Sequence, residues 1–195
     1  EVAIDMPAGP SEVEVIADES ANPAFIAADF LSQAEHGVDS QAMLVTASES
    51  IVEPIMQAIR EQLDRLPRKE ITEKSLSHSR LIVLKDKQEV IDFTNLYAPE
   101  QLIIQTTDYA DIAGQVENAG SVFMGSYTPE SAGDYASGTN HTLPTNGYAK
   151  AYSGVNLDSF IKKITFQEIT ADGIRLLGGT IRTMAANEQL DAHKN

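Results

Sequence analysis

The chain has 195 residues, a formal net charge of −15 and 42% hydrophobic residues, which fits one large domain or a domain with an extension. The acidic surplus argues against a nucleic-acid partner and against binding to an anionic membrane surface, and no apolar stretch is long enough to span a bilayer. The absence of cysteine excludes disulfides, thiolate zinc sites and a cysteine nucleophile, and it fits a reducing cytoplasm.

Segments typical of strands alternate with segments typical of helices over most of the chain. The strand-like runs are short and mainly apolar, at residues 13–17, 43–46, 80–84, 102–105 and 121–124. The helix-like runs between them begin at Asn22-Pro23 and then cover residues 54–66, 87–96 and 110–118. Because apolar strands separated by helices are typical of a parallel sheet covered on both faces, we predict an α/β fold with a Rossmann-like, mostly parallel sheet flanked by helices.

The composition changes after residue 125. Residues 126–154 are rich in Gly, Ser, Thr, Pro and Asn and lack periodicity, which is typical of a functional loop. Helical patterns return at 157–161 and 171–190. We therefore predict an α/β domain over residues 1–150 and a C-terminal helical arm over residues 151–195. No G-x-G-x-x-G sequence occurs, so the sheet need not bind a dinucleotide in the usual place.

One charged residue lies inside a predicted strand. Glu14 interrupts the apolar run that begins at Val13. We expect an edge position at which the carboxylate faces solvent, since glutamate is rarely buried. A pairing segment absent from this sequence and an altered residue are the alternatives.

Gln33 and His36 stand near the end of the first predicted helix, and Gly37 follows as a stop signal. Three residues apart, they share one helix face and can reach one small target. An amide oxygen and a neutral imidazole suit a borderline metal such as zinc. A histidine in the last turn can also simply cap the final carbonyl groups, so the pair alone leaves both interpretations open.

Two further segments contain isolated polar groups. Asp134 and His141 stand among small residues in a predicted loop, where catalytic groups are common, although a turn residue and a surface histidine are alternatives. Pro99 restricts the residue before it to extended or turn geometry, so Glu100 is expected at a fixed point beside the fourth strand. A fixed carboxylate can act as a general base, whereas a solvated glutamate is the plainer alternative.

Five runs together resemble the histidinol dehydrogenase family, in order and with compatible spacing: residues 4–13, 31–37, 97–102, 133–141 and 190–193. The resemblance covers the whole chain and is to the C-terminal part of those enzymes, so the α/β domain over residues 1–150 would be incomplete without upstream sequence. It implies a zinc-dependent enzyme that oxidises L-histidinol to L-histidine through the aldehyde, with NAD, in the last step of histidine biosynthesis. It further implies a homodimer in which residues 151–195 cross to the partner.

The resemblance also implies a ligand set for zinc. Gln33, His36 and Asp134 match three ligands, and His193 matches a fourth that is donated to the partner's site. Oxygen and nitrogen ligands of this kind suit zinc with open positions. Zinc would mainly hold and orient the substrate, so Gln33 and His36 also count as substrate-binding residues.

Other matches concern the substrate and the proton transfers. Ser11, His141 and Glu188 match substrate-contacting positions, and Glu100 matches the base that activates water for the second oxidation. Most NAD contacts would come from sequence upstream of this chain, so no cofactor-binding residue is assigned here.

Gln101 departs from the resemblance, because the family has a catalytic histidine at that position. Glutamine cannot take up and release a proton near neutral pH, so catalysis is expected to be impaired or lost while hydrogen bonding survives. A family member that oxidises another alcohol is one alternative. A zinc- and ligand-binding homologue without catalysis is another.

Overall fold

Five parallel strands form the sheet of the computed structural model, which describes residues 6–195. The strands are β1 (Glu12–Ala17), β2 (Gln41–Thr46), β3 (Arg80–Val83), β4 (Gln101–Gln105) and β5 (Ser121–Met124), and their spatial order is β3-β2-β1-β4-β5. Every pairing among these strands is parallel, which confirms the predicted α/β fold with a Rossmann-like sheet. Ile4 and Asp5, in the first family-like run, lie outside the described residues.

Helices connect consecutive strands. Between strands lie α1 (Pro23–Ala34), η1 (Glu49–Ile51), α2 (Val52–Leu63), α3 (Lys69–Leu76), α4 (Lys87–Tyr97) and α5 (Tyr109–Ala113). After β5 come α6 (Glu130–Tyr135), η2 (Tyr148–Lys150), η3 (Leu157–Phe160), α7 (Ala171–Asn187) and α8 (Asp191–Lys194). The sequence pattern did not predict α3 or α6, and the helix expected at 157–161 is the short 3-10 turn η3.

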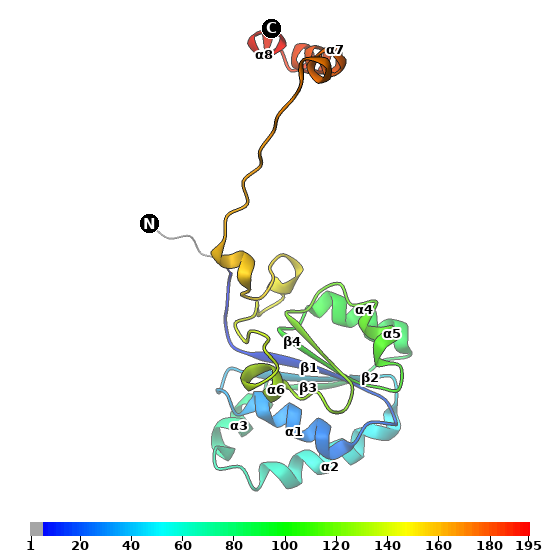
Figure 1. The fold of residues 1–195 in the computed structure, drawn as a ribbon. Coiled ribbons are helices and arrows are strands. Elements are labelled where there is room, and N and C mark those ends of the chain that lie inside the picture. Colours follow the sequence, from blue (N-terminus) through cyan, green and yellow to red (C-terminus); the bar gives the residue numbers. More distant parts are fainter. Residues whose placement is uncertain (1–5) are drawn as a thin grey trace. The chain divides into compact units, whose positions relative to one another are not determined.

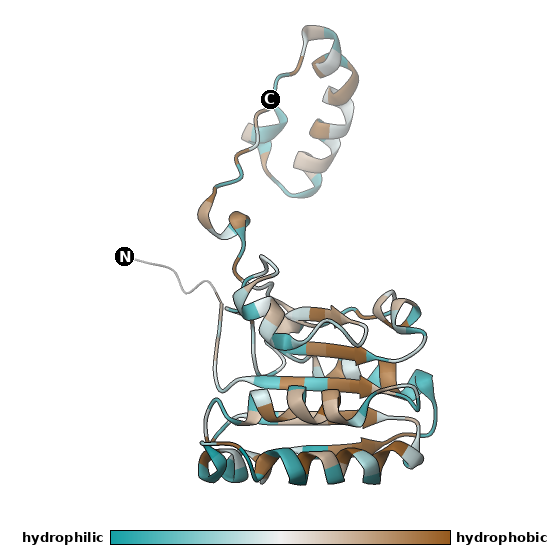
Figure 2. Cartoon of the chain, turned by 60° about the horizontal axis from the view of Figure 1, so that its bottom comes forward, coloured by the Kyte–Doolittle hydropathy of each residue, from teal (hydrophilic) through white to brown (hydrophobic). Residues whose placement is uncertain are grey.

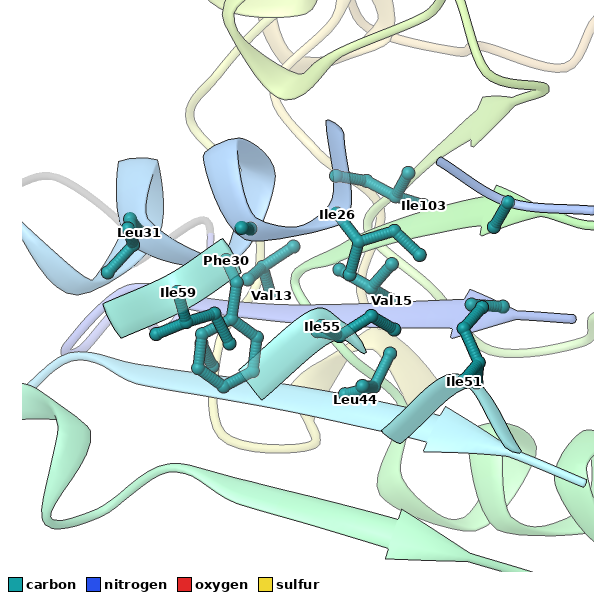
Figure 3. Close-up of a cluster of buried hydrophobic side chains, with 14 of the residues drawn as sticks. Val13, Val15, Ile26, Phe30, Leu31, Leu44, Ile51, Ile55, Ile59 and Ile103 are labelled. Carbon is teal, nitrogen blue, oxygen red and sulfur yellow. The ribbon is translucent and has the colours of Figure 1, made fainter. Parts of the chain in front are cut away.

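The sheet separates two apolar layers. Alternate residues of β1 point to opposite faces, so Val13 and Val15 pack with α1 and α2, whereas Ile16 packs with α4 and α5. Figure 1 shows α1, α2 and α3 on one side of the sheet and α4 and α5 on the other. Figure 3 shows the larger layer, and Figure 2 shows that the strands are apolar over most of their length.

Glu14 does not face solvent, which corrects the predicted edge position. β1 is the central strand of the sheet, and Glu14 is completely buried within it. Its Oε1 atom lies 2.5 Å from the hydroxyl of Thr94 on α4, and its Oε2 atom has no hydrogen-bond partner. Burial raises the pKa of Glu14 to about 8.

The chain divides into two compact units. The first ends at Phe160, and the second comprises Ile161–Asn195 with α7 and α8. The predicted boundary near residue 150 and the crossing of the arm to a partner stay predictions. Among the described residues, no helix is both long and apolar enough to cross a membrane.

Candidate metal and substrate site

A cavity of about 290 Å³ opens at the amino ends of β1 and β4. Ser11 immediately precedes β1, and Gln101 is the first residue of β4, where it is in register with Val13 of β1. Parallel α/β sheets usually bind ligands at the opposite, carboxyl edge, so this placement is unusual. The cavity is lined by Ser11, His36, Glu100, Gln101, Asp134, Tyr135 and His141.

The end of α1 carries two of the predicted ligands. Asn22 caps the start of this helix by accepting a hydrogen bond from the backbone N–H of Ala24, as its sequence predicts. Gln33, in the last turn, is completely buried, and neither atom of its amide has a hydrogen-bond partner. An unpaired buried amide is costly unless something else binds it, which fits a ligand such as a metal ion.

The contacts of His36 are compatible with a helix-capping role and with a metal-ligand role. Its Nδ1 atom lies 2.9 Å from the carbonyl oxygen of Ser32, so the ring contacts a carbonyl of the last helical turn. When Nδ1 carries the hydrogen, it donates to this carbonyl and leaves the lone pair of Nε2 free. Histidines that bind metals are commonly oriented by such a contact to a backbone carbonyl.

Close backbone packing holds Glu100. α4 ends at Tyr97, and Ala98 then adopts a left-handed conformation with φ of 56°. The backbone N–H of Gly120 donates to Pro99, which brings the start of β5 against this turn. The Oε2 atom of Glu100 accepts a hydrogen bond of 2.9 Å from the backbone N–H of Glu12. Burial raises the pKa of Glu100 to about 7, which suits a general base.

We expect Gly120→Ala to lower the free energy of unfolding by about 1–3 kcal/mol. A Cβ atom at this position would lie 2.5 Å from the carbonyl oxygen of Glu100, and a backbone atom cannot move aside as a flexible side chain can. Chemical denaturation measures the change. Gly114→Ala is the control, because the nearest atom to its Cβ would be 3.5 Å away. Equal losses in the two variants would contradict the close approach.

α6 brings Asp134 to the cavity. A Cβ atom at Gly133 would lie 2.5 Å from the ring of Phe123 on β5, so only glycine lets α6 pack this closely. Figure 1 shows α6 beside α1, which carries His36 just beyond its end. This packing places a short polar helix, rather than a loop, over the amino end of the sheet.

Glu130 is a site residue that the sequence did not reveal. It is 1% exposed, and its Oε1 atom accepts a hydrogen bond of 3.0 Å from the amide of Gln101. Burial, together with the neighbouring charge of Asp134, raises its pKa to about 8. The sequence offered one indication, because Glu130 and Asp134 are four residues apart and would share one face of a helix. That spacing is informative only if the segment is known to be helical, which the sequence pattern did not predict.

The site can hold a cation. Potential ligand atoms of His36, Glu130 and Asp134 all lie within 4.8 Å of one another. The described residues that line the cavity include no Lys or Arg to balance these carboxylates. Oxygen and nitrogen ligand atoms of this kind suit zinc.

Two predicted site residues lie in the second unit. Glu188 caps the end of α7, and His193 lies in α8, with both side chains exposed. Their assignment to the site stays a prediction. Six of the other seven predicted residues line one cavity: Ser11, His36, Glu100, Gln101, Asp134 and His141. The seventh, Gln33, is buried and is not among the residues that line it.

Comparisons with known proteins give one consistent answer. The family model for histidinol dehydrogenase matches residues 1–195. A histidinol dehydrogenase of Bacteroides fragilis is 68% identical, and the match covers 100% of this chain and 46% of that protein. A chloroplastic histidinol dehydrogenase of Arabidopsis thaliana is 59% identical, and the match covers 99% of this chain and 42% of that protein. A crystal structure of histidinol dehydrogenase from Elizabethkingia anophelis matches with a TM-score of 0.95 and 58% identity, over 99% of this chain and 45% of that chain. The chain thus spans about half the length of these relatives.

Proposed function

The chain belongs to the histidinol dehydrogenase family, which acts in histidine biosynthesis, and we propose that it carries the zinc- and substrate-binding part of such an enzyme. The reaction is the oxidation of L-histidinol to L-histidine through the aldehyde, by two hydride transfers to NAD, in the cytoplasm. The observation that supports this proposal most is the convergence of His36, Glu100 and Asp134 on one cavity, with the buried and unpaired amide of Gln33 in the last turn of the helix that precedes His36.

Zinc, when bound, supplies a template that holds and orients the substrate. Gln33, His36 and Asp134 of this chain would hold it, together with His193 of the partner subunit in a homodimer. The buried amide of Gln33 supports this assignment, because no described residue satisfies its hydrogen-bonding capacity. The carbonyl contact at Nδ1 of His36 supports it also, because that contact fixes the orientation of the ring.

The other residues of the cavity bind the substrate and move protons. Ser11 and His141 line the cavity and are assigned to substrate contacts, with Glu188. Glu100 takes a proton from water in the second oxidation, and its raised pKa fits that role. Gln101 can accept or donate a hydrogen bond there but cannot act as a base, so the chain as it stands is expected to be slow or inactive. Most contacts to NAD are expected to come from residues that are not part of this sequence.

A second candidate function follows from Gln101. A protein with this site could bind zinc and an amino alcohol without turnover, since glutamine removes the proton acceptor and leaves the ligand groups in place. Oxidation of a different alcohol by the same site is a further possibility within the family. Turnover with histidinol and with plain diols separates these candidates from the leading one.

Calorimetric titration of L-histidinol tests the proposal, with zinc-loaded and chelator-treated protein compared. We expect binding only with zinc, and we expect Asp134→Asn to weaken zinc binding by at least about tenfold, because it removes a charged ligand. Asp92→Asn on α4 is the control, since this exposed aspartate lies outside the cavity. Equal zinc affinity of the two variants, or binding of histidinol that ignores the chelator, would contradict the proposed metal site.

A further inference from the structure

The amide of Gln101 has one partner and one free end. Its Nε2 atom donates to Oε1 of Glu130 at 3.0 Å. Its Oε1 atom is buried without a hydrogen-bond partner, although the residue lines the cavity and is only 4% exposed. An unpaired buried carbonyl oxygen requires a donor from a ligand or water. The carbonyl oxygen of Gln101 is therefore an acceptor without a donor among the described residues.

Glu130 holds the amide of Gln101 in this orientation. Its Oε2 atom lies 3.3 Å from the hydroxyl of Ser32, whose one hydrogen can be donated to it or to the carbonyl oxygen of Asp29 at 2.8 Å. The Oε1 atom of Glu130 accepts from the NH₂ group of Gln101, so the NH₂ group lies on the side of Glu130 and the carbonyl oxygen on the other side.

We propose that Glu130 is a positioning residue, which turns the amide of Gln101 so that its carbonyl oxygen accepts a hydrogen bond from the hydroxyl of a bound amino alcohol. The inference rests on the proposed function, since it takes the amino alcohol as the ligand. It also explains how the site could bind the alcohol in preference to the carboxylate product. The product has no hydrogen to donate to this oxygen, and its negative charge would be repelled by Glu100, Glu130 and Asp134 nearby.

The experiment compares L-histidinol with its deoxy analogue, in which hydrogen replaces the hydroxyl, by calorimetry on the zinc-loaded full chain. We expect the parent to bind histidinol about tenfold more tightly than the analogue, as one buried hydrogen bond suggests. Glu130→Leu should reduce this ratio to below about threefold, because the amide of Gln101 can then turn. Gln101→Leu should reduce the ratio of the two affinities equally. The double variant should have the same ratio as either single variant, because the two residues act through one interaction.

Two matched variants separate positioning from a merely structural role. Ser32→Ala removes a contact to Glu130 but keeps Oε1 as an acceptor, and Glu130→Gln keeps an acceptor oxygen, so both should retain most of the ratio. A tenfold ratio that persists in Glu130→Leu would overturn the inference while leaving the proposed function intact. A parent that binds neither compound with zinc present would overturn both.

A crystal structure of the parent with histidinol keeps the inference testable if Glu130→Leu does not fold. We expect the hydroxyl oxygen of the ligand within about 3.0 Å of Oε1 of Gln101, with Nε2 still bonded to Glu130. A hydroxyl more than about 3.5 Å from that oxygen, or an amide turned the other way, would overturn it.

Discussion

Glu14→Gln is expected to stabilise the protein at pH 7.5 by on the order of 3 kcal/mol and to change its stability little at pH 5. The reason is the complete burial of this carboxyl in the central strand, which raises its pKa from 4.5 to about 8. Thr94 can donate its single hydrogen to Oε1 of Glu14 or to the carbonyl oxygen of Val90, and Oε2 of Glu14 has no partner among the described residues. A negative charge on Glu14 would therefore be poorly compensated.

The sign follows from the number of protons bound in each state. Between pH 4.5 and about 8 the folded protein keeps the proton of Glu14, whereas the unfolded chain releases it. The folded state therefore binds more protons, and its stability falls as the pH rises through this window. Glutamine does not titrate, so the stability of the variant should not fall in this way as the pH rises. The difference in free energy of unfolding between the variant and the parent should therefore grow with pH.

Denaturant unfolding of the parent and of Glu14→Gln at the two pH values measures this effect. Glu117→Gln is the control, because that glutamate is exposed, and we expect a change within about 0.5 kcal/mol at both pH values. A difference between Glu14→Gln and the parent that is the same at pH 5 and pH 7.5 would show that Glu14 is ionised in the folded protein.

The sheet was predictable because its signal is local. Five short apolar runs separated by helical patterns require a parallel sheet covered on both faces, and all five strands occur where the pattern places them. The strand order could not be derived in the same way, since it depends on how the connections cross the sheet. The placement of Glu14 at the centre rather than at an edge is a consequence of that order.

The site was predictable only in part, because its residues come from separate elements. Motif resemblance predicted Gln33, His36 and Asp134 as ligands, and the packing of α6 against β5 and α1 brings Asp134 to the cavity that His36 also lines. Glu130 had no such signal. Its role arises from a contact with Gln101, which lies 29 positions away and meets it only after α6 forms.

The largest change in activity is expected from Gln101→His. The resemblance to the family places histidine at this position, and a positioned general base contributes about 10²–10⁴-fold to the rate. The hydrogen bond from Gln101 to Glu130 supports the substitution, since the same carboxyl oxygen can accept from one ring nitrogen and leave the other free to take the proton of the alcohol.

We therefore expect Gln101→His, introduced into an enzyme that contains this chain together with its NAD-binding part, to raise histidinol-dependent reduction of NAD by about 10²–10⁴-fold. The rate should increase as the pH rises through the ordinary pKa of imidazole, about 6.5. Gln101→Leu is the control, since it provides neither base nor acceptor and should gain nothing. Adding Glu100→Gln to the histidine variant should stop the reaction after the first hydride transfer, because Glu100 is assigned to the second oxidation. If Gln101→His binds histidinol as tightly as the parent but is no faster, the limiting step lies outside this proton transfer, and the assignment of position 101 as the base would be wrong.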